Sequence, residues 1–267
     1  MDNTSSTHNK VREYYGQLAR TSQSCCELQN KLYPIETIKA LPTEIVNFTA
    51  GSGNPLRLAQ LQTGETVLDL GSGGGLDCFL AAQQVGENGF VFGVDMTPEM
   101  LARARESAQN LRFKNVEFRE GFLEALPIDD NSIDIVISNC VINLSPDKSK
   151  VIQEIARVLK PGGRMIVSDI VTNSQLPEEG RKIDDDWCGC ASGAMTVKEY
   201  IERLEKAGLM NITIQPDLES APLVNEPDAE QVSEGETTER RLQILKDWGQ
   251  CERIIYLPHM ISAHKPG

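Results

Sequence analysis

The segment that decides the fold spans residues 66–77 and reads TVLDLGSGGGLD. The apolar run from Val67 to Leu70 is typical of a buried strand, and the glycines after it let backbone approach a ligand without a Cβ in the way. Residues Leu76 to Val85 predict a helix, whose N-terminus presents free N–H groups. A second apolar run ends in Asp95, which suits the two hydroxyls of a ribose. The segment therefore predicts a nucleoside-binding unit.

The glycine pattern separates two kinds of nucleoside ligand. A dinucleotide fingerprint reads G-x-G-x-x-G and directs a helix N-terminus at a pyrophosphate. Here Gly71 and Gly73 are followed by Leu76 at the third glycine position, and Asp69 stands just before the first glycine. A carboxylate there repels phosphate but suits a ligand that carries an amino group and a sulfonium. The segment resembles motif I of the class I S-adenosylmethionine (SAM) methyltransferases; the alternative is an unrelated α/β turn with a chance cluster of glycines.

Later segments resemble the same superfamily in the same order. The pair Leu126-Pro127 precedes SIDIVIS at 132–138, and EIARVLKPGG at 154–163 precedes a further strand. The resemblance implies SAM as cofactor and an α/β fold, a Rossmann-like sheet with helices on both faces. It implies cofactor contacts from Asp69, Gly71, Gly73, Asp95, Met96, Gly121, Phe122 and Asn139.

Length, charge and composition narrow the class of protein. The chain has 267 residues and a formal net charge of −13, with a pI near 4.8, which argues against nucleic acid or an anionic membrane as partner. No apolar run approaches the roughly 20 residues that cross a bilayer, and the polar start lacks the apolar stretch of a signal peptide. We expect a soluble, cytoplasmic protein whose cysteines are mostly thiols.

The chain is expected to divide into three parts. Residues 1–62 form a polar, partly helical lead-in; residues 63–172 alternate strands and helices as a SAM-binding Rossmann-like domain; residues 173–267 form a smaller C-terminal α+β substrate region. In that last part we expect a capped helix over 196–207 and a final strand over 254–263. The acidic stretch 217–239 is predicted to be an exposed loop, with no functional role assigned.

Cysteines are better candidates than histidines for the site that holds the methyl-accepting substrate. The three histidines, His8, His259 and His264, lie near the termini and are expected at the surface. Cys140 follows the strand over 133–137, and ligands of doubly wound sheets bind beyond the carboxyl ends of strands. Taken alone, Cys140 is as readily a core residue as a ligand, and Cys78 is expected in the core. The Cys-Gly-Cys at 188–190 strengthens the hypothesis of a thiophilic substrate, because thiolates select soft ions.

These cysteines stand in segments that together resemble the arsenite methyltransferases over nearly the whole chain. The segments are EYYG at 13–16, CC at 25–26, GSGNP at 51–55, SNCVINLS at 138–145, SD at 168–169, CASGA at 190–194 and ISAHKP at 261–266. The resemblance implies that Cys140 and Cys190 bind trivalent arsenic, supplied as arsenite or methylarsenite for detoxification. It also implies that Tyr14 and Gly16 cap the cofactor, and that Cys25 and Cys26 form a thiol relay served by glutathione or thioredoxin.

One position departs from the family pattern. Where the family has a third arsenic-binding cysteine, this chain has Ser52, and a hydroxyl is a poor ligand for a thiophilic ion. Three outcomes stay open: two thiolates with a small thiol as third ligand, Cys188 as a substitute, or another substrate. The corresponding alternative functions are methylation of a selenium, tellurium, thiol or organic acceptor, and metalloid binding without turnover.

Overall fold

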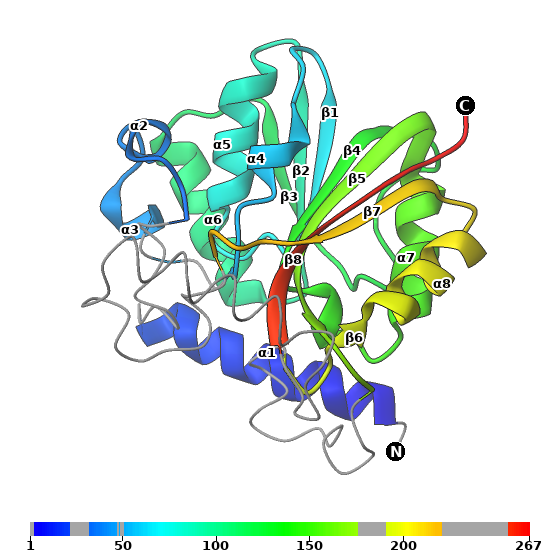
Figure 1. The fold of residues 1–267 in the computed structure, drawn as a ribbon. Coiled ribbons are helices and arrows are strands. Elements are labelled where there is room, and N and C mark those ends of the chain that lie inside the picture. The colour runs from blue at the N-terminus through cyan, green and yellow to red at the C-terminus, as the bar shows by residue number, and fades with distance from the viewer. Residues whose placement is uncertain (1–2, 22–31, 47, 49–50, 176–190, 221–255) are drawn as a thin grey trace, which may run out of the picture.

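A computed structural model describes residues 3–21, 32–46, 48, 51–175, 191–220 and 256–267 (Figure 1). The helices are α1 (Asn3–Thr21), α2 (Ile35–Ile38), α3 (Thr43–Val46), α4 (Leu56–Ala59), α5 (Leu76–Val85), α6 (Pro98–Asn110), the 3₁₀ turn η2 (Ile142–Leu144), α7 (Lys148–Val158) and α8 (Val197–Lys206). The strands are β1 (Thr66–Leu70), β2 (Phe90–Asp95), β3 (Val116–Glu120), β4 (Ile133–Asn139), β5 (Leu159–Thr172), β6 (Met195–Thr196), β7 (Met210–Pro216) and β8 (Tyr256–His264). Across the described helices, none has both the length and the apolar character that a membrane span requires.

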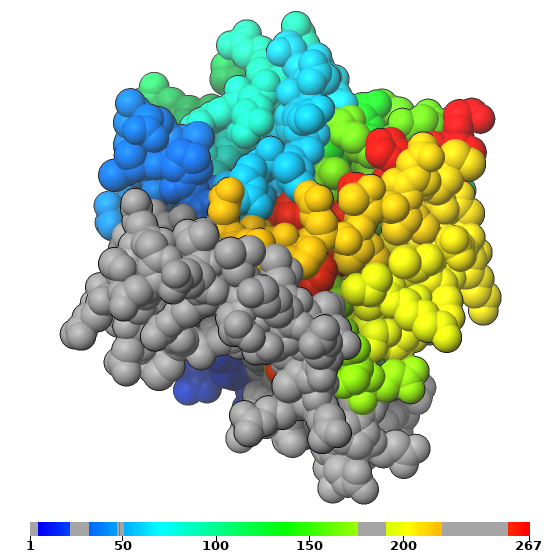
Figure 2. Space-filling view, in the orientation of Figure 1, coloured from blue at the N-terminus to red at the C-terminus, as the bar shows by residue number. Residues whose placement is uncertain are grey.

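The strands form one mixed sheet in the order β3-β2-β1-β4-β5-β8-β7, with β6 paired to the end of β5. The pairs among β1 to β5 are parallel, whereas β8 runs antiparallel to both β5 and β7. The α/β prediction is therefore confirmed. Strands β7 and β8 extend the sheet formed by β1 to β5. In the space-filling view, the C-terminal segment is visible at the surface as small patches beside β7 (Figure 2). The domain boundaries at 62 and 172 stay predictions.

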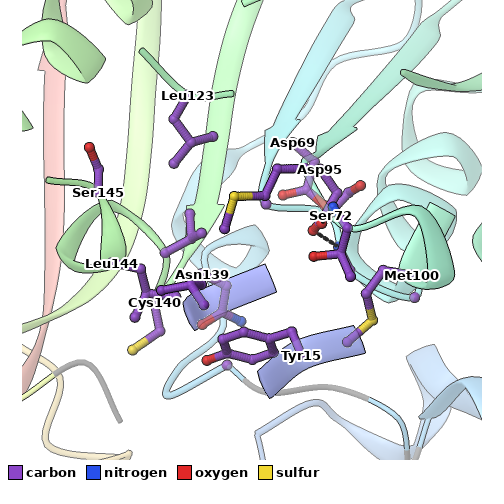
Figure 3. A pocket seen from close by; sticks show the side chains of 18 of the residues that line it. Tyr15, Asp69, Ser72, Asp95, Met100, Leu123, Asn139, Cys140, Leu144 and Ser145 are labelled. Atoms are coloured by element: carbon purple, nitrogen blue, oxygen red, sulfur yellow. Dashed lines mark hydrogen bonds between the residues drawn. The ribbon is translucent and has the colours of Figure 1, made fainter. Parts of the chain in front are cut away.

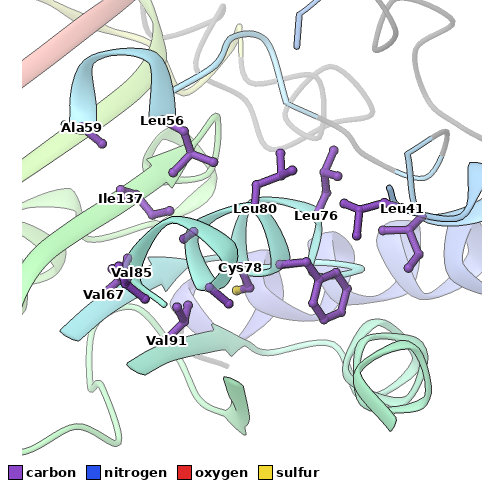
Figure 4. Close-up of a cluster of buried hydrophobic side chains, with 14 of the residues drawn as sticks. Leu41, Leu56, Ala59, Val67, Leu76, Cys78, Leu80, Val85, Val91 and Ile137 are labelled. Atoms are coloured by element: carbon purple, nitrogen blue, oxygen red, sulfur yellow. The ribbon is translucent and has the colours of Figure 1, made fainter. Parts of the chain in front are cut away.

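The core lies on both faces of this sheet. Successive strand residues point to opposite faces, so Val67 packs with α4, α5 and α6, and Leu68 with α7 and α8. Figure 4 shows the first of these layers, in which Cys78 on α5 faces the sheet. Its side chain is fully buried, which confirms the prediction that it is a core residue. Both faces being covered explains the near-continuous apolar runs of the central strands.

Local signals set most element ends. Thr196 begins α8 with the expected capping box, in which its hydroxyl accepts the Glu199 N–H. The residue before α6, Thr97, makes no side-chain cap. The sequence pattern predicts a strand after the segment at 154–163, but β5 already begins at Leu159 inside that segment. Leu159 pairs with Ile133, and a register shift follows. The glycine pair in this segment is hydrogen-bonded to the C-terminal segment, because Gly162 donates its N–H to Lys265 O at 3.1 Å.

Candidate functional site

A pocket opens at the carboxyl ends of β1, β2, β3 and β4 and is also lined by α1. We call it the central pocket (Figure 3). Each strand end and α1 contributes residues to its lining. The described lining includes His8, Val11, Tyr15 and Leu18 of α1, Asp69 and residues 71–74 after β1, residues 95–97 after β2, residues 121–124 after β3, and residues 139–141, 144 and 145 after β4. This placement beyond parallel strand ends is where doubly wound sheets bind ligands.

The glycine turn brings two strand ends together. Gly71 has a φ of +67°, and a Cβ on it would lie 2.4 Å from Cγ2 of Val141, the residue after Cys140. Only glycine adopts this conformation readily and leaves that contact open. Gly73, with a φ of +49°, has nothing within 4 Å of the Cβ position, so its backbone faces open space in the pocket. The turn is therefore shaped for close approach of a ligand.

Asp95 is fixed by the turn it faces. Its Oδ2 accepts the Gly73 N–H at 2.9 Å, and its Oδ1 accepts the Thr97 N–H at 2.8 Å. The first bond ties the end of β2 to the glycine turn, and the second fixes the residue that precedes α6. Burial raises the pKa of Asp95, while these backbone bonds act in the opposite direction.

Two further carboxylates make the pocket acidic. Asp69 is only 3 % exposed, and burial together with the charge of Asp77 raises its pKa well above the ordinary value. Burial raises the pKa of Asp77 to about 6, although hydrogen bonds from Tyr33 and Asn139 lower it. The described lining contains neither lysine nor arginine. Such a site favours a cationic ligand, because a positive group would offset the cost of burying the carboxylates.

Cys140 lies at the other side of the central pocket in Figure 3. It is 7 % exposed and has a φ of +59°, a conformation that costs a non-glycine residue roughly 1–3 kcal/mol. Its N–H donates to Ser168 O at 2.7 Å, which fixes the backbone in this state. Cys140 packs in an apolar cluster with Val11, Ile170 and Ala194. A thiol is thus held in a strained, largely dry position facing the pocket.

Asn139 joins the loop of Ser52 to the same strand end. Its Oδ1 accepts the N–H groups of Ser52 at 3.1 Å and Gly53 at 3.3 Å, and its Nδ2 donates to Gly53 O at 2.7 Å. Nδ2 also lies 3.3 Å from Asp77 Oδ2. The hydroxyl of Ser52 is buried and has no hydrogen-bond partner among the described residues. The structure therefore brings Ser52 against the residue that precedes Cys140.

The remaining predicted cysteines lie outside the described residues: Cys25, Cys26, Cys188 and Cys190. The residue after Cys190 is described, however. Ala191 O accepts the N–H of Ala194 at 3.0 Å, and Ala194 packs with Cys140. A Cβ on Gly193 would lie 2.1 Å from Asn143 O, so this turn abuts the loop after β4.

Several expectations need correction or addition. His8 lines the central pocket and His259 is 1 % exposed, so the prediction that both lie at the surface is wrong. Within the EYYG segment at 13–16, Tyr15 lines the pocket, whereas Tyr14 is exposed and neither Tyr14 nor Gly16 is among the lining residues. The spacing of His8, Val11, Tyr15 and Leu18 marks one helical face and could have revealed this set.

The start of the acidic stretch 217–239 also differs from the exposed loop that was predicted. Asp217 is buried, accepts a hydrogen bond from Ser220 and pairs with Arg57 at 2.7 Å. Sequence reasoning missed this because the partner Arg57 lies far away in the chain. Residues 221–239 lie outside the described residues.

Comparison with known proteins agrees with this geometry. Residues 61–208 match a family described as "Methyltransferase domain". An arsenite methyltransferase of Halobacterium salinarum is 39% identical over 84% of this chain and 62% of its own length, and one of Mus musculus is 36% identical over 75% and 57%. The chain thus spans about three fifths of the length of these curated relatives.

A solved structure extends the comparison to the fold. An arsenic(III) S-adenosylmethionine methyltransferase from Chlamydomonas reinhardtii superposes with a TM-score of 0.62 at 32% identity, covering 88% of this chain and 75% of that one. Both the matching domain and the matching fold include the strand ends that line the central pocket. The chain belongs to the arsenite methyltransferase family of SAM-dependent methyltransferases.

Proposed function

We propose that this chain transfers methyl groups from SAM to trivalent arsenic, as arsenite or methylarsenite, for arsenic detoxification. The observation that carries the proposal is Cys140, a thiol held in a strained conformation at the edge of an acidic pocket built for a nucleoside. Arsenic is soft and thiophilic, and a thiolate is the protein ligand that suits it. The identity to arsenite methyltransferases supports the same substrate.

The described residues fit SAM as the cofactor, which supplies an electrophilic methyl group when bound. Asp69 and Asp77 suit its ammonium and sulfonium charges, and Asp95 suits the ribose hydroxyls. We assign the amino acid part to Gly71 and Gly73, and the adenine to Met96, Gly121 and Phe122, which line the pocket beyond β2 and β3. The Asn139 side chain bonds the Ser52 loop and lies 3.3 Å from Asp77 Oδ2, and its cofactor contact stays a prediction, as do those of Tyr14 and Gly16.

For the methyl acceptor, the protein must bind arsenic and exclude water from it. We propose that Cys140 and Cys190 bind arsenic as thiolates, so that its lone pair faces the methyl group. The apolar cluster of Val11, Ile170 and Ala194 around Cys140 limits competing water. After transfer arsenic is pentavalent, and we propose Cys25 and Cys26, with glutathione or thioredoxin in a reducing cytoplasm, as the relay that restores trivalency.

The proposal is tested by formation of S-adenosylhomocysteine (SAH) from SAM by the full chain. We expect SAH to form in proportion to added arsenite and not in its absence. SAH formation with selenite, tellurite or an organic thiol but not arsenite would identify a different acceptor. Arsenite binding without any SAH would identify a metalloid-binding protein without turnover.

The buried carboxylates make cofactor binding depend on pH. We expect SAM affinity to fall as pH drops from 7.5 to 5.5, because Asp77, whose pKa burial raises to about 6, becomes neutral and no longer attracts a cation. Calorimetric titration with SAM measures this, and Asp77→Asn should flatten the dependence. The stability of the ligand-free protein should depend on pH in the opposite sense. Asp77 has an ordinary pKa of 3.8 in the unfolded chain and of about 6 in the folded protein, so the cost of burying it grows as pH rises from about 3.8 to about 6. Affinity that does not change with pH would contradict the assignment.

Position 52 should control arsenite affinity. We expect Ser52→Cys to tighten arsenite binding by about tenfold or more and to remove the need for an added thiol, because a third thiolate would then stand beside Asn139, the residue that precedes Cys140. Arsenite titration followed by thiolate–arsenic ultraviolet absorption measures the change. The matched control is Ser132→Cys, whose hydroxyl bonds Asp129 O away from the central pocket. Unchanged affinity in Ser52→Cys would show that this position does not face the arsenic.

A further inference from the structure

A second polar group lines the central pocket, apart from the carboxylates that we assign to the cofactor. Glu124 Oε1 accepts a hydrogen bond from Ser145 Oγ and lies 3.1 Å from His8 Nε2. The Glu124 side chain is only 14 % exposed. Its other oxygen, Oε2, receives no hydrogen bond from the described residues. One oxygen is therefore held by two partners while the second is available to a ligand, which is how a binding carboxylate is arranged.

This group stands on the Cys140 side of the pocket. Ser145 follows Cys140 through the short η2 turn, and Figure 3 shows Ser145, Leu144 and Cys140 on one side, opposite Asp69 and Asp95. Ser145 is itself fixed, since its hydroxyl accepts the Asp147 N–H at 3.1 Å. Through Ser145, the Glu124 carboxylate is thus attached to the same loop after β4 that carries Cys140.

Arsenite that is bound by two thiolates keeps one hydroxyl, which needs a hydrogen-bond acceptor such as Glu124. Arsenite carries three hydroxyls, and each of two thiols forms one As–S bond and releases one water, so that As(OH)₃ + 2 RSH gives (RS)₂AsOH + 2 H₂O with arsenic still trivalent. One hydroxyl remains because position 52 is serine. A hydroxyl in the apolar surroundings of Cys140 costs free energy unless it finds an acceptor.

We infer that Glu124, held by Ser145 and His8, binds the hydroxyl that remains on arsenite; this rests on the proposed function. Methylarsenite on two thiolates carries a methyl group at that position and has no hydroxyl left. Glu124 is thus a substrate-selective residue, which assists the first methylation and not the second. A hydrogen bond to a charged carboxylate is stronger than one between neutral groups, and its loss leaves the hydroxyl unpaired.

The test compares one methyl transfer to each substrate, in single-turnover reactions of the reduced full chain with SAM and without added thiol. For Glu124→Ala we expect SAH formation with arsenite to slow by about tenfold or more, and that with methylarsenite to stay within about twofold. Ser145→Ala, which removes only the hydroxyl that holds Glu124, should shift the two rates in the same direction by less. Added glutathione should shrink the arsenite defect, because it replaces the remaining hydroxyl.

The matched control is Glu117→Ala on β3, an exposed glutamate paired with Arg119. It should leave both rates unchanged, and SAH affinity should be unchanged in every variant. Equal losses with the two substrates, or loss of SAH affinity in Ser145→Ala, would overturn the inference. A wild-type protein that forms no SAH with arsenite would instead overturn the proposed function, and that result is known before any variant is compared.

Discussion

Cys140→Ser is expected to reduce arsenite methylation by at least about 100-fold while leaving SAH affinity within a few-fold. A serine hydroxyl stays protonated at neutral pH and binds soft trivalent arsenic poorly, whereas its size preserves packing with Val11 and Ile170. The backbone bond from residue 140 to Ser168 O does not involve the side chain and should persist. Steady-state methylation rates and calorimetric titration with SAH measure the two quantities.

The control for this variant is Cys251→Ser, at a cysteine to which no role is assigned, and it should retain methylation. Loss of SAH binding in Cys140→Ser would show that the thiol supports the pocket rather than the substrate. Retained methylation would remove Cys140 from the arsenic site altogether. Thermal unfolding of both variants separates either result from a general loss of stability.

Asp95→Ala is expected to weaken SAH binding by about 100-fold. The substitution removes the ribose acceptor and leaves the N–H groups of Gly73 and Thr97 without their partner, so both the ligand contact and the shape of the glycine turn are lost. At about 1.4 kcal/mol per factor of ten, this corresponds to roughly 2.8 kcal/mol. Calorimetric titration with SAH measures it directly.

Asp130→Ala is the matched control for Asp95→Ala, because Asp130 is an exposed carboxylate that pairs with Arg157 outside the central pocket. Its SAH affinity should equal that of the wild type. An Asp95→Ala protein that binds SAH normally would mean that Asp95 serves only to hold the turn. It would also remove the ribose assignment.

The parallel sheet and the cofactor end of the site were predictable because their signals are local. A strand, a glycine turn and a terminal acid follow one another within residues 66–95, and short-range geometry alone places Asp69, Gly71 and Asp95 at one sheet edge. The same holds for α8, whose capping box is contained in four residues from Thr196 to Glu199.

The parts that escaped prediction depend on contacts between distant segments. Glu124 meets His8 across 116 positions of sequence, and Asp217 meets Arg57 across 160, so neither pair leaves a local pattern. The left-handed backbone of Cys140 also has no signature in its residue type, since it is imposed by the bond to Ser168. On α1, the pocket-lining residues form one helical face that includes Tyr15, and the cofactor contact expected of Tyr14 stays a prediction.

The central claim is that arsenic is methylated in the pocket beside Cys140. The most direct measurement is speciation of arsenic by chromatography coupled to elemental mass spectrometry, after incubating the full chain with arsenite, SAM and glutathione. The account predicts methylated arsenic with one SAH formed per arsenic–carbon bond. Unmethylated arsenite as the sole arsenic species, in protein that demonstrably binds SAM, would contradict it.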